Sequence, residues 1–260
     1  MADATNENIR RRHDERKRKR IQQMKRRRFI TVSLLIIIAL LIVIFFTPLF
    51  KIRRVEIVGN QRVSALEIEE KLGECRGKNI FRFRTGTPIK NIKAIPYVEG
   101  VKIDKSVFLT KITVNITECV PAAYVEVGEK DVILDKQLKV LEVVEEVELD
   151  IPELVDITIL DVNPGSTVNL KNDDILNVMK NCMEVFLNEG ILDGIEYISF
   201  EDSENITFNY QERLDVICGG TDNFEKKIKL FNQALNTKKL SDKSRGTIDL
   251  SVLGQAVYTP

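Results

Sequence analysis

The sequence contains one histidine and no tryptophan among its 260 residues. The histidine, His13, lies in an N-terminal stretch that is rich in Lys and Arg. Catalytic triads, metal sites and acid–base devices that need an imidazole are therefore excluded from residues 51–260. Pairs of carboxylates are abundant there, and they leave open a glycosidase, which needs only two such groups.

Cysteine is also scarce, with four residues and no C-x-x-C pair. This spacing disfavours a metal site, so we expect no metal and no cofactor. Two of the four fall in apolar patterns typical of small buried side chains, whereas a disulfide stays open as an alternative. The four positions are Cys75, Cys119, Cys182 and Cys218.

The formal net charge of zero hides a division of the chain into three parts. Residues 1–28 hold twelve Lys or Arg against four Asp or Glu, and residues 29–50 hold no charged side chain. Residues 51–260 hold 27 basic and 35 acidic side chains. With 43% hydrophobic and 30% charged residues, the chain is also too apolar for a disordered tail and too charged for a multi-span transporter.

Residues 29–50 are predicted to be a transmembrane signal anchor. Of these 22 residues, 17 are Leu, Ile, Val or Phe, and a helix of this length spans about 33 Å, enough to cross a bilayer. The excess of positive charge before the segment predicts a cytoplasmic N-terminus and a single-pass type II protein. The membrane-orienting residues are Lys25, Arg26, Arg27 and Arg28.

Other interpretations of this N-terminal region are weaker. The apolar run is longer than that of a cleaved signal peptide, and no small-residue cleavage site follows it. The basic tail of residues 1–28 resembles a nucleic-acid arm in charge, but it has no aromatic residue and directly precedes a membrane segment. Attraction to anionic lipid headgroups is the simpler explanation.

Residues 51–119 have the pattern of a small α+β module. The predicted elements are a strand over 52–58, a helix after the Ser64–Glu67 capping box, a helix opened by Thr87-Pro88, and strands over 97–104 and 111–118. The order β-α-α-β-β predicts two helices that cover one face of a three-stranded sheet.

Residues 120–252 are predicted to form a second, β-rich module with two helices packed on a mainly antiparallel sheet. The expected strands cover residues 124–127, 132–136, 138–144, 195–200, 206–210, 214–218 and 247–252. The helices begin near Asn172 and Asn223, and each carries one apolar stripe. Residues 151–154 and 163–165 are expected to be loops, and residues 253–260 a C-terminal tail.

The first module resembles a POTRA domain. The motifs that carry this resemblance are Gly59-Asn60, Gly77-Lys78-Asn79-Ile80-Phe81, Ile95-Pro96-Tyr97-Val98, and Glu118 followed by Pro121-Ala122. Two positions depart from the pattern: Leu109 stands where a proline is common, and Cys119 where a basic residue is common.

The whole chain resembles the bacterial cell-division family FtsQ/DivIB. The order of tail, anchor, POTRA module and β-rich module matches, as do the segments Lys226–Leu235, Gly246–Leu250 and Gly254–Val257. The resemblance implies a non-enzymatic scaffold at the division septum that regulates septal peptidoglycan synthesis. It also implies partners of the FtsL and DivIC/FtsB type, contact with septal peptidoglycan synthase components, and no nucleic acid.

We predict that such partners bind by strand addition to an edge strand at Thr247–Val252. Ile248, Leu250 and Val252 are expected to face the core, while Val257 and Tyr258 lie over the added strand. The predicted partner-binding residues are Thr247, Ile248, Asp249, Leu250, Ser251, Val252, Val257 and Tyr258. Completion of this chain's own sheet is the structural alternative for this segment.

Two other functions stay open. A POTRA-type chaperone or docking module for extracytoplasmic polypeptides would bind many unrelated extended peptides. An anchored cell-wall hydrolase would use a carboxylate pair, because the sequence lacks a G-x-S-x-G motif and any cysteine with a basic partner motif.

Overall fold

The computed structural model describes residues 24–44, 47–236, 244–252 and 254–260. Within them, one helix, Met24–Ile44, is long and apolar enough to cross a membrane. It begins N-terminal to the predicted segment 29–50, and its described part reaches Ile44, within that segment. Thr47 has an extended backbone, and Pro48 opens the short 3-10 helix η1 (Pro48–Phe50). Proline disfavours helical geometry in the residue before it, so the helix does not continue through this point.

The positively charged residues Lys25–Arg28 lie in the first turns of this helix and are exposed. The predicted basic tail is otherwise outside the described residues, since residues 1–23 are not among them.

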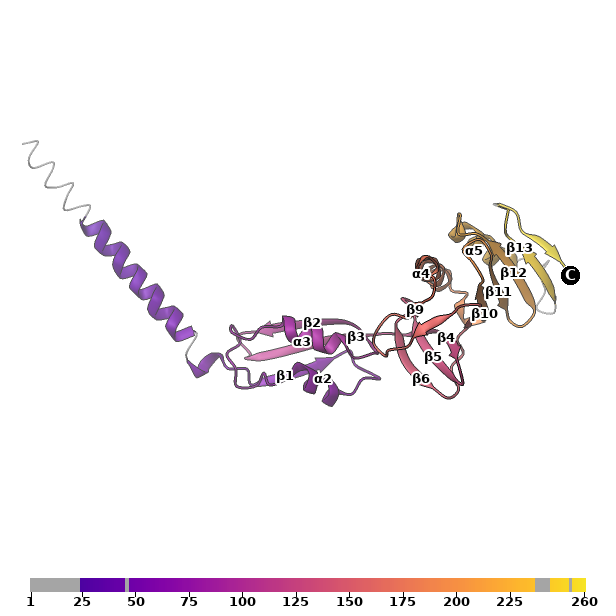
Figure 1. Cartoon of the computed structure of the whole chain (residues 1–260). Helices are drawn as coiled ribbons and strands as arrows, with labels where there is room; N and C mark the ends of the chain where they lie inside the picture. Colours follow the sequence, from indigo (N-terminus) through magenta and orange to yellow (C-terminus); the bar gives the residue numbers. More distant parts are fainter. Residues whose placement is uncertain (1–23, 45–46, 237–243, 253) are drawn as a thin grey trace, which may run out of the picture. The chain divides into compact units, whose positions relative to one another are not determined.

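The first module has the predicted order of elements (Figure 1). It consists of β1 (Arg54–Val58), α2 (Ala65–Leu72), α3 (Gly86–Lys93), β2 (Val98–Ser106) and β3 (Lys111–Glu118). The sheet order is β1-β3-β2. As predicted, Ser64 caps α2 by accepting a hydrogen bond from the Glu67 N–H at 3.1 Å.

Two features hold the end of β3, the last strand of this module, against the loop between β1 and α2. Gly59 has φ +91°, and a Cβ atom there would lie 2.2 Å from the Ile116 carbonyl oxygen, so only glycine fits. The Glu118 carboxylate accepts hydrogen bonds from the backbone N–H groups of Gln61, Arg62 and Val63 at 2.8–3.1 Å. The last strand is thereby tied to the loop before α2.

The second module is built on a nine-stranded sheet in the order β14-β13-β12-β11-β10-β7-β4-β5-β6. Its strands are β4 (Pro121–Val127), β5 (Lys130–Asp135), β6 (Val140–Val144), β7 (Glu153–Val155), β10 (Ile195–Phe200), β11 (Ile206–Tyr210), β12 (Leu214–Gly219), β13 (Gly246–Asp249) and β14 (Val257–Thr259). A separate pair, β8 (Ile159–Asp161) and β9 (Asn169–Leu170), and a 3-10 turn, η2 (Leu192–Gly194), complete it.

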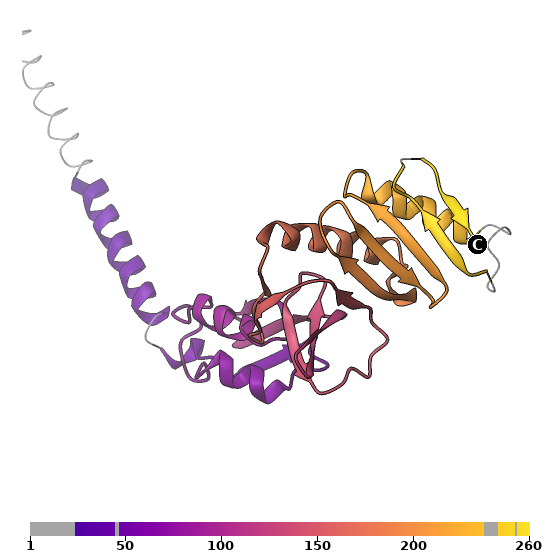
Figure 2. The same ribbon diagram turned by 45° about the vertical axis from the view of Figure 1, so that its right-hand side comes forward.

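Two helices, α4 (Asp173–Asn188) and α5 (Phe224–Leu235), lie on one face of this sheet (Figure 2). Their apolar stripes share one buried cluster with the facing strand residues. Phe186 of α4 and Phe231 of α5 each pack edge-to-face against Phe208 of β11, with ring centroids 5.2 and 5.3 Å apart. These packed rings hold both helices on the sheet.

The prediction missed four short strands. Strands β7, β8, β9 and β14 have two or three residues each, and the first two residues of β7, 153 and 154, belong to the expected loop 151–154. Yet β7 is the parallel link between β10 and β4. Strands this short are too brief to show an alternating pattern.

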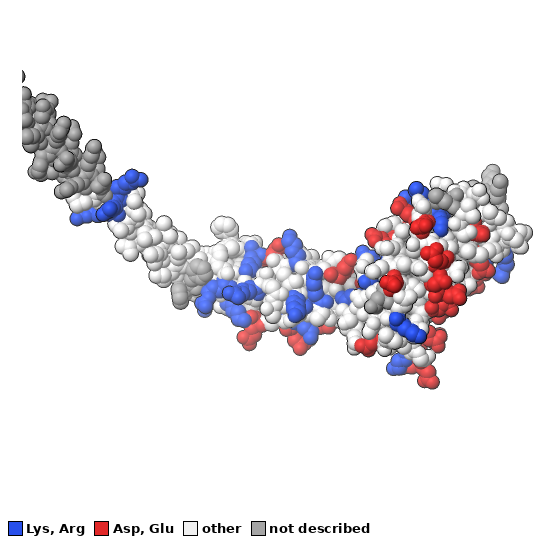
Figure 3. Space-filling model, turned by 45° about the horizontal axis from the view of Figure 1, so that its top comes forward, with Lys and Arg blue, Asp and Glu red and all other residues white. Residues whose placement is uncertain are grey.

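Charge differs between the two modules. Residues 51–119 hold 14 Lys or Arg against 8 Asp or Glu, a net charge of +6. Residues 120–260 hold 13 against 27, a net charge of −14. In Figure 3, Lys and Arg gather on the first module, and Asp and Glu are more prominent on the second.

Candidate functional site

The predicted binding segment Thr247–Val252 is not an edge strand. Strand β13 pairs in parallel with β12 on one side and antiparallel with β14 on the other. The register places Thr247 opposite Thr259, Ile248 opposite Tyr258 and Asp249 opposite Val257. Residues 257–259 thus occupy the side of β13 that we had expected a partner to use.

Gly246 allows this pairing. A Cβ atom at Gly246 would lie 2.2 Å from the Thr259 carbonyl oxygen, and its φ of +149° is also unfavourable for other residues. The Tyr258 hydroxyl donates a hydrogen bond to the Arg245 carbonyl oxygen at 2.7 Å. The fold-back of the C-terminus therefore rests on the absence of a side chain at position 246.

The side-chain directions in this segment were partly predicted. Ile248 and Leu250 are buried in the main core, as expected, but Val252 is 59% exposed. The chain turns after Asp249, whose carboxylate accepts a hydrogen bond from the Ser251 N–H at 2.8 Å. Hydrogen bonds from the Ser251 side chain and backbone lower the pKa of Asp249. This turn ends the strand before Val252 reaches the core.

Strand β14 is the true edge on this side of the sheet. All three of its residues are exposed, and its neighbour in the sheet is β13. In an antiparallel pair, alternate residues turn their N–H and C=O groups away from the partner strand. The outer rim of β14 therefore offers backbone groups to an added strand.

The opposite edge, β6, is less accessible. The Val140 N–H donates to the Ser166 carbonyl oxygen, and the Val140 carbonyl oxygen accepts from the Gly165 N–H, both at 2.8 Å. Lys139 also forms a bridge with Thr167. The segment 165–167 thus covers the start of β6, which leaves β14 as the better edge for strand addition.

The sheet face opposite α4 and α5 is acidic at its centre. Tyr124 on β4 and Tyr197 on β10 both lie beside Glu153 of β7. Burial and the charges of Glu126 and Asp131 raise the pKa of Glu153. Burial and nearby carboxylates likewise raise the pKa of both tyrosines. For Tyr124 the carboxylates are Glu153, Asp131, Glu196 and Glu126. For Tyr197 they are Asp215 and Asp156.

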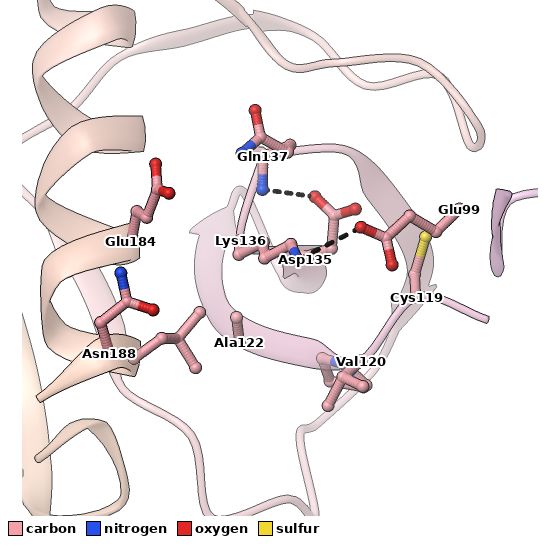
Figure 4. Close-up of a pocket in the computed structure, with 11 residues that line it drawn as sticks. Glu99, Cys119, Val120, Ala122, Asp135, Lys136, Gln137, Glu184 and Asn188 are labelled. Atoms are coloured by element: carbon pink, nitrogen blue, oxygen red, sulfur yellow. Dashed lines mark hydrogen bonds and ion pairs between the residues drawn. The ribbon is translucent and has the colours of Figure 1, made fainter. Parts of the chain in front are cut away.

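A cavity of about 540 Å³ lies where β3 leads into β4 (Figure 4). Asp135 lies in it and accepts a hydrogen bond from the Gln137 N–H at 2.8 Å, while Lys136 forms an ion pair with Glu99 at 3.2 Å. Burial, followed by the charge of Asp135, raises the pKa of the Cys119 thiol to about 12. This thiol is therefore protonated at neutral pH and is a poor nucleophile.

The other cysteines do not suggest chemistry either. All four lie in the described part of the chain as buried thiols, and no disulfide joins them. Burial raises the pKa of Cys182 to about 12 and that of Cys218 still further. Among the described residues, no group of three or more His, Cys, Asp or Glu side chains is placed to hold a metal ion.

Comparison with known proteins identifies the first module. A family model described as "POTRA domain, FtsQ-type" matches residues 50–118. The cell division protein DivIB of Clostridium botulinum is 26% identical over 215 residues, which cover 81% of this chain and 82% of that protein. The chain is related to the FtsQ/DivIB proteins. The predicted resemblance is thereby confirmed.

Other FtsQ/DivIB relatives match over smaller shares of their own length. The cell division protein FtsQ of Corynebacterium glutamicum is 30% identical over 95 residues, which cover 36% of this chain and 42% of that protein. DivIB of Staphylococcus aureus is 26% identical over 218 residues, which cover 80% of this chain and 45% of that protein. The relatives are named for cell division, and this supports a role in that process.

Proposed function

We propose that this protein is a non-enzymatic, membrane-anchored scaffold of the bacterial divisome, inserted with its N-terminus in the cytoplasm and enriched at the division septum. In this function it links single-pass partners of the FtsL and DivIC/FtsB type and thereby regulates septal peptidoglycan synthesis. Support comes from the division-protein relatives, the FtsQ-type POTRA domain and the apolar helix Met24–Ile44.

The observation that carries the binding mechanism is the exposed C-terminal edge. A partner strand adds to the outer rim of β14, over residues Val257, Tyr258 and Thr259. Addition is favoured over displacement of β14, because displacement would first break the ladder between β13 and β14. The proposed contact therefore moves from Thr247–Val252 to the strand that covers it, and residues 247–252 become its support.

The expected affinity of this contact alone is low. Two or three ladder hydrogen bonds at about 0.5–1.5 kcal/mol each give only a few kcal/mol before the ordering costs of the partner are subtracted. When both proteins are anchored in one bilayer, the second contact becomes effectively intramolecular, and the local concentration reaches the millimolar range. The membrane helix is thus part of the binding mechanism.

Co-purification from membranes tests this function. The full chain is compared with Tyr258→Pro, which removes one backbone N–H from β14 and disfavours its ladder. Leu160→Pro serves as the matched control, because it alters the exposed three-residue strand β8 in the same way. We expect the partners to be retained by the unaltered chain and by Leu160→Pro, and lost from Tyr258→Pro.

A truncation that ends at Gln255 distinguishes the two modes of strand binding. Loss of both partners from this truncation supports addition to β14. If binding persists or strengthens, the partner pairs with β13 in place of β14, and the proposed mode is wrong. Retention of the partners by a truncation that ends at Ser244 would exclude this sheet edge altogether.

Catalysis is not part of the proposal. Cys119 and Cys182 are thiols whose pKa values are raised to about 12, and Glu153 lies on a β-sheet face between two tyrosines. Incubation of the full chain in detergent with purified peptidoglycan checks this point. Release of soluble glycan or peptide fragments that disappears in Glu153→Gln would favour the anchored hydrolase instead.

A further inference from the structure

A cationic cavity lies at the end of the POTRA domain where the chain arrives from the membrane helix. It has a volume of about 450 Å³ and is lined by Thr47, Lys51, Gly77, Lys78, Asn79, Arg82 and Phe83. Three of these side chains are basic and none is acidic. The cavity thus combines positive charge with hydroxyl and amide groups, a lining suited to a phosphate group.

Backbone hydrogen bonds fix this cavity to the first residues after the membrane helix. The Phe50 carbonyl oxygen accepts from the Ile80 N–H, and the Ile52 N–H donates to the Lys78 carbonyl oxygen, both at 2.9 Å. Lys51 follows the last described helical residue, Ile44, by only seven positions, a reach of at most about 25 Å. The cavity is therefore held close to the bilayer surface.

Exposed apolar side chains lie at the same end of the domain. Phe108 and Leu109, in the turn between β2 and β3, are 102% and 64% exposed. The Arg53 N–H donates to the Thr110 carbonyl oxygen at 2.8 Å, so this turn is joined to the start of β1. A fully exposed phenylalanine in a turn is costly in water but favourable in the interfacial layer of a membrane.

The charge around these side chains is predominantly positive. Residues 47–56, 74–85 and 104–113 hold nine Lys or Arg against three Asp or Glu. Arg53, Lys78, Arg82 and Arg84 are all exposed. Cations beside exposed apolar groups are the combination by which interfacial segments bind anionic lipid.

We propose that this end of the POTRA domain binds the membrane surface. The cavity formed by Lys51, Lys78 and Arg82 takes the phosphate of an anionic lipid headgroup, and Phe108 and Leu109 enter the interfacial layer. The contact holds the POTRA domain against the bilayer in which the chain is anchored. It is independent of the partner-binding edge on β14.

The absence of tryptophan from the sequence provides a direct test. Phe108→Trp introduces a single tryptophan into the full chain, which is reconstituted in nanodiscs of phosphatidylcholine with or without phosphatidylglycerol. Lipids with brominated acyl chains quench a tryptophan that enters the bilayer. Leu160→Trp, on the exposed strand β8 of the second module, is the control.

We expect the emission of Trp at position 108 to be blue-shifted and quenched in discs that contain phosphatidylglycerol. High salt, at about 1 M, should reduce this quenching because it shortens the Debye length to about 3 Å. Trp at position 160 should remain unquenched in all discs. Equal emission at position 108 in brominated and unbrominated discs would overturn the proposal.

A second set of variants tests the cavity. Lys51→Gln, Lys78→Gln and Arg82→Gln are combined in the Phe108→Trp chain, and the control combines Lys71→Gln, Lys90→Gln and Lys93→Gln on α2 and α3. Each cavity cation removed should lower the ratio of bound to unbound domain about fivefold in anionic discs. The control should behave like the parent chain.

The remaining outcomes are equally informative. Quenching that is the same in zwitterionic discs, or that the cavity variants leave unchanged, would overturn the assignment of the cavity to lipid phosphate. Inorganic phosphate is added as a competitor, and suppression of quenching by millimolar phosphate would indicate a site for free phosphate instead. Circular dichroism of each variant excludes unfolding as the cause of lost quenching.

Discussion

Lys227 is a buried polar residue that binds the turn between β12 and α5 in the second module. Its side chain is only 5% exposed, and its ammonium group donates hydrogen bonds to the carbonyl oxygens of Cys218 and Gly220 at 2.8 and 2.9 Å. The Gly219-Gly220 segment therefore serves as a turn between β12 and α5. Lysine is rarely buried unless it is paired in this way.

Lys227→Met should destabilise the protein by about 1–3 kcal/mol, because the buried carbonyl group of Cys218 and the partly buried one of Gly220 lose their donor. The exposed neighbour supplies the control, since Lys226→Met removes the same charge from the surface of α5. Chemical unfolding of both variants in detergent measures the difference. Equal midpoints would contradict a structural role for the Lys227 hydrogen bonds.

Glu118 gives a pH-dependent contribution to the POTRA domain. Burial raises its pKa, but backbone hydrogen bonds from Arg62, Val63 and Gln61 and the Arg62 charge outweigh it, so the pKa lies below its usual 4.5. The carboxylate therefore stabilises the fold above the pKa of the unfolded chain. This stabilisation is lost as the pH falls through the lowered folded-state pKa.

Glu118→Gln should lower the unfolding free energy at pH 7 by about 1–2 kcal/mol. The difference from the parent chain should shrink as the pH falls below about 4, where the parent carboxylate becomes protonated as well. Urea unfolding at several pH values measures this trend. A difference that does not change with pH would show that the charge of Glu118 is unimportant.

At the scale of elements, the sequence predicted those with strong local patterns. Helix α2 was located by its Ser64 cap, α4 by its apolar stripe, and β3 by its strict alternation. Strands β7 and β14 were missed because their three residues are defined by pairing with distant strands. The edge of the sheet was assigned to the wrong strand for the same reason, since no local pattern indicates that Thr259 approaches Gly246.

Gly246→Ala should loosen β14 from β13. The added Cβ atom would lie 2.2 Å from the Thr259 carbonyl oxygen, and β14 is held by only three residue pairs. Gly254→Ala is a matched control, because Gly254 also has a positive φ but no atom lies within 4 Å of its added Cβ. Hydrogen exchange should accelerate at 257–259 in Gly246→Ala alone.

This variant also bears on the function. If the partner adds to β14, Gly246→Ala should weaken partner retention, because the outer rim is no longer held in place. If exchange at 257–259 matches that of the Gly254→Ala control, the close approach at Gly246 does not hold β14 on the sheet.

At the scale of the whole molecule, charge is ordered along the chain. The POTRA region carries a net charge of +6 and the region after it −14. An anionic membrane surface attracts the first and repels the second. This order agrees with the proposed contact between the POTRA domain and an anionic membrane surface.

The positive charges at the start of the membrane helix are expected to set the orientation of the chain in the membrane. Replacing Lys25, Arg26, Arg27 and Arg28 with Gln leaves eight basic residues among the first 28, against six in residues 51–76. The bias that retains the N-terminus in the cytoplasm is then smaller, and a fraction of chains should insert in the opposite direction. External protease digestion of intact cells measures this fraction, because inverted chains have a protected C-terminal module.

Replacing Lys17–Arg20 with Gln removes the same charge farther from the helix and should invert fewer chains. If both variants are digested as completely as the parent, the residues nearest the helix do not control orientation.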